Sequence, residues 1–120
     1  MKLLRKLARS FYYAIKGVLY AFSSERNMKI HFFLAAVAIL LAWFFGVSKM
    51  EWLVVFLMIG LVICLEMVNT AIEALVDLVT GEYRYWAAVA KNVAAGAVFF
   101  ASIIAIVVAI IIFLPYVQAL

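Results

Sequence analysis

Three long apolar stretches dominate this chain of 120 residues and limit what it can fold into. They cover residues 30–47, 50–79 and 86–114, and each is long enough to cross a bilayer as a helix, which takes about 17–25 residues. Hydrophobic residues make up 72% of the sequence, whereas a soluble domain holds about 45–50%. We therefore exclude an ordinary soluble protein. We expect an all-α integral membrane protein with three transmembrane helices in a single domain over residues 1–120.

The segment before these stretches separates basic from apolar side chains. Residues 2–22 are predicted to form an amphipathic helix that lies in the membrane interface, with one face that carries Lys2, Arg5, Lys6, Arg9, Tyr13 and Lys16. Seven of the ten basic residues lie within the first 29 positions. The positive-inside rule then places the N-terminus and the connection at 80–85 in the cytoplasm, and the turn at 46–50 and the C-terminus outside. This clustering favours a membrane surface over nucleic acid as the partner.

Local signals indicate where the helices end and how they pack. Ser23 or Ser24 is predicted to cap the helix that follows, and Pro115 is predicted to end the last one. Small residues in the third span would let helices approach closely, at positions Ala90, Ala94, Ala95, Gly96, Ala97 and Ala101. Because charged groups inside a membrane need partners, we expect a homo-oligomer.

Four polar residues share one stripe of the second span. Glu66, Asn69, Glu73 and Asp77 are spaced so that they fall within roughly 80° on a helix. A charge at membrane depth costs about 2.5–3.5 kcal/mol on insertion scales, so such residues indicate a functional site. The alternative is that Glu73 and Asp77 simply reach water and that Asn69 joins helices.

The chemistry of this stripe favours metal and phosphate. Mg²⁺ prefers oxygen ligands and is usually held by one or two carboxylates together with substrate phosphates. A further carboxylate can take a proton from a hydroxyl nucleophile, and Lys91, at a similar depth on the third span, can neutralise phosphate charge. Phosphoryl transfer to a lipid hydroxyl fits this set, although the chain has no Walker-type loop.

Three sequence motifs resemble one family. Residues 66–77 read EMVNTAIEALVD, residues 24–31 read SERNMKIH and residues 91–98 read KNVAAGAV. Together they resemble the prokaryotic diacylglycerol kinase and undecaprenol kinase family, with its motifs E-x-x-N-[ST]-A-I-E-x-x-x-D and K-D-x-A-A-G-A-V. The resemblance extends from Phe11 to about Ile112, and its wording favours the undecaprenol kinase branch.

The resemblance implies a bacterial plasma-membrane kinase that transfers the γ-phosphate of ATP to a lipid alcohol, most simply undecaprenol. Glu66 would bind the lipid hydroxyl and act as the general base, with Asn69 in support. Glu25 and Glu73 would bind the Mg²⁺ that carries ATP, and Lys91 would contact the transferring phosphate. A homotrimer with active sites shared between protomers at the cytoplasmic interface is also implied.

The resemblance further assigns the nucleotide contacts. They comprise Lys6, Tyr13, Glu25, Glu73, Asp77, Glu82, Tyr83, Arg84, Lys91 and Asn92. The chain departs from the family at Asn92, where the family carries aspartate. An amide cannot pair ionically with a neighbouring cation, so we expect the chain to bind nucleotide but to turn over slowly.

Three alternatives remain open from the sequence. The first is a diacylglycerol kinase that produces phosphatidic acid, because apolar helix faces do not distinguish acyl from prenyl chains. The second is a small proton-coupled transporter in which Glu66 carries the proton. The third is a membrane protein with a structural role and no chemistry.

Overall fold

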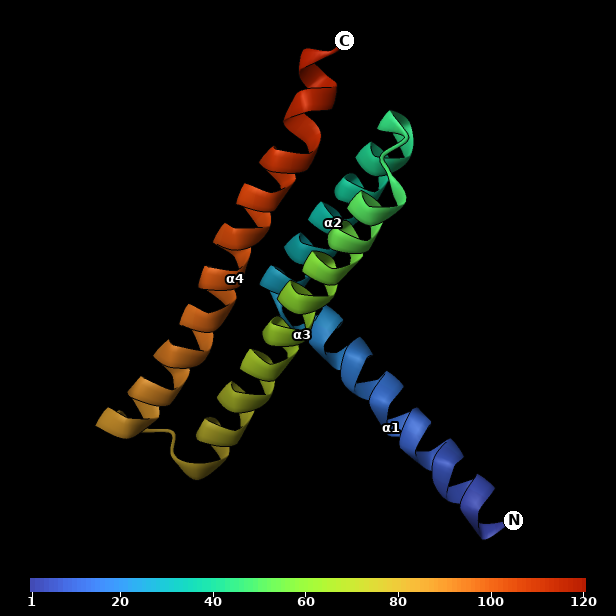
Figure 1. The fold of residues 1–120 in the computed structure, drawn as a ribbon. Coiled ribbons are helices and arrows are strands. Elements are labelled where there is room, and N and C mark those ends of the chain that lie inside the picture. The colour runs from blue at the N-terminus through green and yellow to red at the C-terminus, as the bar shows by residue number, and fades with distance from the viewer.

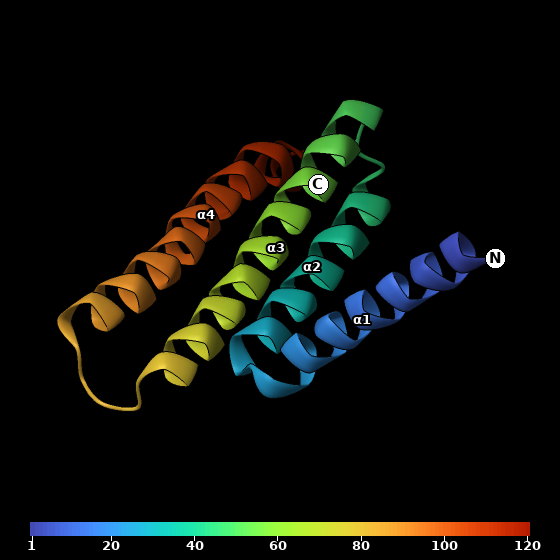
Figure 2. The same ribbon diagram turned by 90° about the horizontal axis from the view of Figure 1, so that it is seen from below.

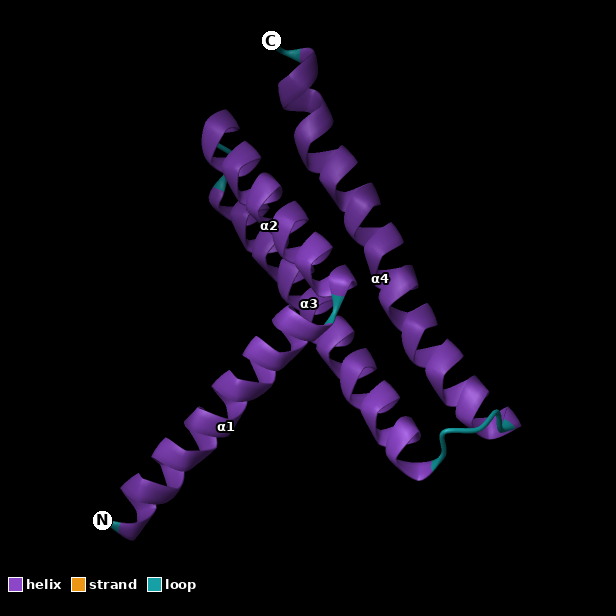
Figure 3. Cartoon of the chain, turned by 180° about the vertical axis from the view of Figure 1, so that it is seen from behind, coloured by secondary structure: helices purple, strands orange, loops and turns teal.

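The computed structural model describes all 120 residues and is entirely helical. Four helices follow one another along the chain (Figure 1). They are α1 (Lys2–Ser24), α2 (Arg26–Phe45), α3 (Lys49–Val79) and α4 (Tyr85–Gln118). The connections are short, and the longest of them joins α3 to α4 (Figure 3). The all-α prediction is confirmed.

Helices α2, α3 and α4 are long and apolar enough to cross a membrane. At 1.5 Å per residue the 20 residues of α2 span about 30 Å, the thickness of a bilayer's hydrocarbon core. The 31 residues of α3 and the 34 residues of α4 exceed that thickness. The ends of these two helices can therefore protrude into water, and the chain is a multi-pass membrane protein.

The helices form an open arrangement rather than a closed bundle, with α2, α3 and α4 packed around a shared apolar core. Seen from below, their order across the molecule is α4, α3, α2 and α1 (Figure 2). The molecule is accordingly flat, with extents of 53 × 47 × 21 Å. Helix α1 meets the others near its C-terminal end and then runs away from them (Figure 1), and Ala21 is its single buried residue.

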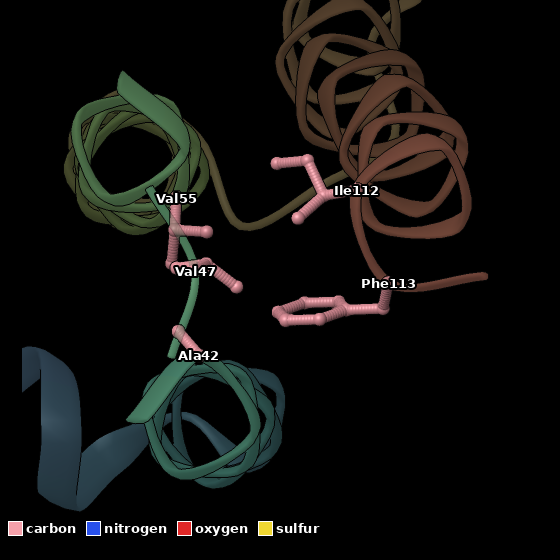
Figure 4. Packing of buried hydrophobic residues seen from close by; sticks show 5 residues of the cluster. All are labelled: Ala42, Val47, Val55, Ile112 and Phe113. Atoms are coloured by element: carbon pink, nitrogen blue, oxygen red, sulfur yellow. The ribbon is translucent and has the colours of Figure 1, made fainter. Parts of the chain in front are cut away.

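The apolar core lies at the end of the helices where the turn connects α2 to α3. Ala42, Val47, Val55, Ile112 and Phe113 form it, with the side chains of Ile112 and Phe113 pointing toward the other three (Figure 4). Only 14 of the 120 residues are buried in the single chain. Most apolar side chains therefore face outward, as expected where lipid or another protein chain surrounds the helices.

The turn at residues 46–48 is set by two local devices. Gly46 adopts the left-handed conformation with φ of 61°, which glycine tolerates without steric cost. Ser48 then caps α3: its side chain accepts a bond from the Glu51 N–H, and the Glu51 side chain accepts one from the Ser48 N–H. This reciprocal capping box starts α3 at Lys49.

Two predictions about helix ends were wrong. Ser23 and Ser24 belong to the last turn of α1, where the Ser23 hydroxyl donates to the carbonyl of Tyr20. Neither serine caps the next helix, and Glu25 separates α1 from α2 in an extended conformation. Hydroxyls also bond well within their own helix, so the sequence signal was ambiguous.

Helix α4 continues through Pro115 instead of ending there. Tyr116, one residue later, stacks on Phe45 and donates a 2.6 Å hydrogen bond to Glu51, which fixes the last turn against α2 and α3. A membrane-spanning helix also tolerates proline better than a helix in water, because unwinding would expose unpaired backbone groups. The prediction that small residues mediate packing is confirmed in part: Ala94 and Ala101 are buried on α4, with Val98 between them.

Candidate active site

The polar stripe of α3 runs from buried to exposed along the helix. Glu66 is only 2% exposed and Asn69 7% exposed, although both carry polar side chains. Glu73, two turns further on, is half-buried, and Asp77 is exposed. A gradient of this kind is what a site would show if it opened from the membrane interior toward water.

Helix geometry gives the distance of each residue along α3, which can be compared with a hydrocarbon core that begins at Trp52. Counted from Trp52 at 1.5 Å per residue, Glu66 lies about 21 Å along α3, inside a hydrocarbon core of about 30 Å. Glu73 lies about 32 Å along, at the far edge of the core, and Asp77 about 38 Å along, beyond it. Glu66 is thus the carboxylate of the stripe that belongs to the membrane interior.

Glu66 has a partner on the neighbouring span. The Nε2 atom of His31, on the second turn of α2, lies 3.3 Å from Glu66 Oε2. The His31 side chain is 14% exposed. It also lines an apolar cavity of about 310 Å³ between α2, α3 and α4. His31 therefore stands between that cavity and the buried carboxylate.

Two buried oxygens of the stripe have no hydrogen-bond partner, Glu66 Oε1 and Asn69 Oδ1. Leaving a buried polar atom unpaired costs about 1–3 kcal/mol, and proteins rarely accept that cost without a reason. By contrast the hydroxyl of Thr70, the residue after Asn69, donates a 3.0 Å hydrogen bond to the Glu66 carbonyl. Both orphaned atoms are acceptors, so the site is arranged to receive protons, N–H groups or a cation.

Glu25, at the junction of α1 and α2, faces the same group of carboxylates. Partial burial, and then the negative charges of Glu73 and Glu66, raise the pKa of Glu25 above its usual value. Glu25, Glu66 and Glu73 come from two segments far apart in sequence, and their carboxylates are thus close enough for their charges to interact. Such an arrangement is unfavourable alone and becomes favourable when a positive charge is added.

Lys91 lies beside the Asp77 end of the stripe, as the sequence predicted. Its Nζ lies 2.7 Å from Asp77 Oδ1, a charge-assisted hydrogen bond that joins α4 to α3. Both side chains are largely exposed, at 40% for Lys91 and 63% for Asp77. The bond is therefore accessible, and an anion that approaches Lys91 can compete with Asp77 for it.

The residues present fit a divalent cation that arrives with a phosphate ligand. No group of three or more histidine, cysteine, aspartate or glutamate side chains in the chain could hold a metal alone. Glu25 and Glu73 supply two carboxylates, which is the number that Mg²⁺ commonly takes from a protein when phosphates complete its coordination.

Other residues singled out in the sequence do not join this group within one chain. Lys6 and Tyr13 are exposed on α1, whose N-terminal part runs away from the other helices (Figure 1). Glu82 and Arg84 pair with each other in the exposed loop at 3.7 Å. Tyr83 and Asn92 are exposed as well.

Comparison with known proteins identifies the fold family. The sequence matches the family described as Prokaryotic diacylglycerol kinase over residues 12–113. An undecaprenol kinase of Bacillus subtilis is 37% identical over 112 residues, which cover 93% of this chain and 91% of that protein. A diacylglycerol kinase of Synechocystis is 42% identical over 107 residues, 88% of this chain but 61% of the relative. One of Haemophilus influenzae is 33% identical over 98 residues, 82% of this chain and 83% of the relative.

The chain belongs to the prokaryotic diacylglycerol kinase family. The resemblance seen in the sequence is thereby confirmed, and the chain is a lipid kinase of this family. The family motif of residues 66–77 occupies the C-terminal half of α3, where the buried and half-buried polar side chains lie.

Sequence reasoning missed His31 as part of the site. One signal could have found it: His31 is the single polar residue in the apolar stretch 30–47, and a titratable residue within a span is a functional candidate by default. Its partner could not be deduced, because the contact joins two residues that lie on different helices and 35 positions apart in the chain.

Proposed function

We propose that this protein transfers the γ-phosphate of MgATP to the hydroxyl of undecaprenol and so forms undecaprenyl phosphate. The observation that carries the proposal is Glu66: a carboxylate 2% exposed, at membrane depth, with Oε1 unpartnered. A membrane lipid presents its hydroxyl near the interface, above its apolar chain. A base for that hydroxyl belongs at this depth, out of reach of bulk water.

Glu66 Oε1 accepts the proton of the lipid hydroxyl as its oxygen attacks the γ-phosphorus. The bond to the bridging oxygen of the β-phosphate breaks, and ADP leaves with the electron pair. Glu25 and Glu73 would hold Mg²⁺, which would neutralise the charge of the phosphates. The raised pKa of Glu25 supports this role, since it reports carboxylates that repel each other until a cation joins them.

Lys91 and Asn69 complete the group around the phosphate. Lys91 exchanges its bond with Asp77 for one with the transferring phosphate, to which a lysine ammonium binds as a point charge. Asn69 Oδ1 is buried and unpartnered one turn from Glu66, and it supports the base and the phosphate. Asp77 and the loop residues Glu82, Tyr83 and Arg84 line the nucleotide.

The remaining nucleotide contacts come from a second copy of the chain in a homotrimer. Lys6 and Tyr13 belong to α1, which runs away from the other helices toward its N-terminus (Figure 1). A neighbouring protomer could bring its own α1 over the site, with Lys6 and Tyr13 beside the nucleotide. In this arrangement the N-terminus and the active site lie on the cytoplasmic side of the bacterial plasma membrane, where ATP is present.

Two lipid alcohols compete as the acceptor. The Bacillus subtilis relative, matched over 91% of its length, carries the name undecaprenol kinase, and the motif SERNMKIH favours that branch. Diacylglycerol is the second candidate, because the relatives of Synechocystis and Haemophilus influenzae carry the name diacylglycerol kinase.

The test offers the purified protein labelled ATP and Mg²⁺ in mixed micelles with undecaprenol, diacylglycerol or ceramide as parallel acceptors. Label in undecaprenyl phosphate at the highest rate supports the proposal. Label predominantly in phosphatidic acid would reassign the substrate. Label in no lipid would contradict the kinase proposal, and flux of cationic drugs into vesicles would then separate a transporter from a structural protein.

A further inference from the structure

We propose that His31 is the positioning residue of the base: it holds Glu66 Oε2 and thereby leaves Oε1 as the oxygen that receives the proton of the lipid hydroxyl. This inference rests on the proposed kinase function. It gives a role to His31, the last residue of the motif SERNMKIH, to which the sequence analysis assigned none, and it explains why one carboxylate oxygen has a neighbour while the other does not.

The first observation is the asymmetry of the Glu66 carboxylate. Oε2 lies 3.3 Å from His31 Nε2, whereas Oε1 is buried without any partner. A free carboxylate on a helix could rotate about its last torsion and exchange the two oxygens. A contact to one oxygen from a second helix removes that freedom and fixes which oxygen faces the substrate.

The second observation is how firmly His31 itself is held. Its side chain is 14% exposed and lines the apolar cavity of about 310 Å³ together with residues of α2, α3 and α4, Leu34 and Ser102 among them. His31 also lies on the second turn of a membrane-spanning helix, so its backbone is fixed by helical hydrogen bonds. A ring restrained in this way can orient a carboxylate, which a mobile surface side chain could not.

The third observation is the length of the contact. At 3.3 Å the nitrogen and the carboxylate oxygen are in close contact, further apart than the 2.7–2.9 Å of a charge-assisted hydrogen bond, and they form no hydrogen bond in the substrate-free chain. Catalytic hydrogen bonds are often long in the absence of substrate and shorten in the reacting complex. When the lipid oxygen bonds to the γ-phosphorus, its proton passes to Oε1 and ADP departs. His31 contacts the other oxygen, Oε2, so it positions the base and does not replace it.

The kinetic test compares three variants in the micelle assay. His31→Phe keeps a ring but removes the N–H donor, His31→Gln keeps a donor, and Leu34→Ala alters the same cavity on the same face of α2 without touching Glu66. We expect His31→Phe to lower kcat about 10- to 100-fold with little change in the KM for lipid or MgATP. His31→Gln should restore a large part of kcat, and Leu34→Ala should retain it. Parent kcat in His31→Phe, or equal losses in His31→Phe and His31→Gln, would overturn the proposal.

A second measurement tests the contact without relying on activity. Melting temperatures of the parent, His31→Phe, Glu66→Gln and the double variant form a double-mutant cycle. A pair that interacts gives a double variant whose loss differs from the sum of the single losses, and strict additivity would overturn the proposal. A parent that phosphorylates no lipid would refute the kinase function, yet this cycle would still decide whether His31 holds Glu66.

Discussion

Glu66 occupies an expensive position for a carboxylate, since the residue is almost fully buried, lies at membrane depth and has one oxygen unpartnered. Stability alone would favour an apolar residue there. The same argument applies with less force to Asn69, whose carbonyl oxygen is also buried without a partner. At the scale of residues, the site is recognised by buried polar groups that lower the stability of the fold and can serve catalysis.

Glu25 gives a prediction that separates function from stability. Burial and the charges of Glu73 and Glu66 raise the pKa of Glu25, so its ionised form destabilises the metal-free fold. This penalty is fully present above the raised pKa and disappears as the pH falls below the ordinary value of 4.5. Glu25→Gln should therefore melt at or above the parent temperature at pH 7.5 without metal, and like the parent near pH 4.

The same variant should weaken the dependence of kinase activity on Mg²⁺ more than the dependence on lipid. Glu73→Gln should behave alike, because it removes the other proposed ligand. Initial rates over a Mg²⁺ titration at saturating lipid measure this effect. Unchanged titration curves in both variants would remove these carboxylates from the metal site.

Asn92 carries a prediction in the opposite direction. The motif that the sequence resembles places aspartate after the lysine, and a carboxylate there would orient Lys91 by a charge-assisted bond. Small misplacements of a catalytic group can cost about 10²-fold in rate. We expect Asn92→Asp to raise kinase activity by up to about that factor. Equal initial rates of the two forms in identical micelles would show that the aspartate is dispensable in this background.

At the scale of elements, α3 combines a membrane span with a catalytic stripe. The part from Trp52 to Leu65 is apolar and the C-terminal part carries the polar stripe, so one helix both anchors the chain and presents the site. The length of the apolar stretches in the sequence was enough to locate this helix and both neighbouring spans. The spacing of its polar residues was enough to put them on one face.

What the sequence could not supply were contacts between elements and the behaviour of helix ends. The pairs His31–Glu66 and Tyr116–Glu51 each join different helices, and no local pattern records which helices become neighbours. Pro115 was expected to end α4 because proline breaks helices in water, but the surrounding contacts and the membrane favour continuation.

The contact between the N-terminal end of α3 and the C-terminal end of α4 should matter for stability and not for catalysis. Tyr116→Phe removes the hydroxyl that donates 2.6 Å to Glu51 while keeping the ring that stacks on Phe45. We expect a lower melting temperature in detergent and unchanged kinase turnover. Tyr20→Phe, at an exposed position on α1, is the matched control and should change neither. An unaltered melting temperature in Tyr116→Phe would mean that this bond adds nothing to the fold.

At the scale of the whole molecule, the open arrangement of the helices leaves apolar faces that a second protein chain could cover. The chain is 21 Å thick in its thinnest direction, and few of its side chains are buried. Lys6 and Tyr13 also belong to α1, which runs away from the other helices toward its N-terminus (Figure 1). We therefore expect native mass spectrometry in detergent to give about three times the 13.5 kDa mass of the chain. A stable, active monomer would contradict the shared site.

The central claim, that a buried membrane carboxylate activates a lipid hydroxyl for phosphoryl transfer, is tested most directly by Glu66→Gln. This change preserves the size of the side chain and removes the basic oxygen pair. With labelled ATP, Mg²⁺ and saturating undecaprenol, we expect turnover to fall by about 10²-fold or more, while nucleotide binding is retained. Turnover near that of the parent protein under the same conditions would show that Glu66 is not the base.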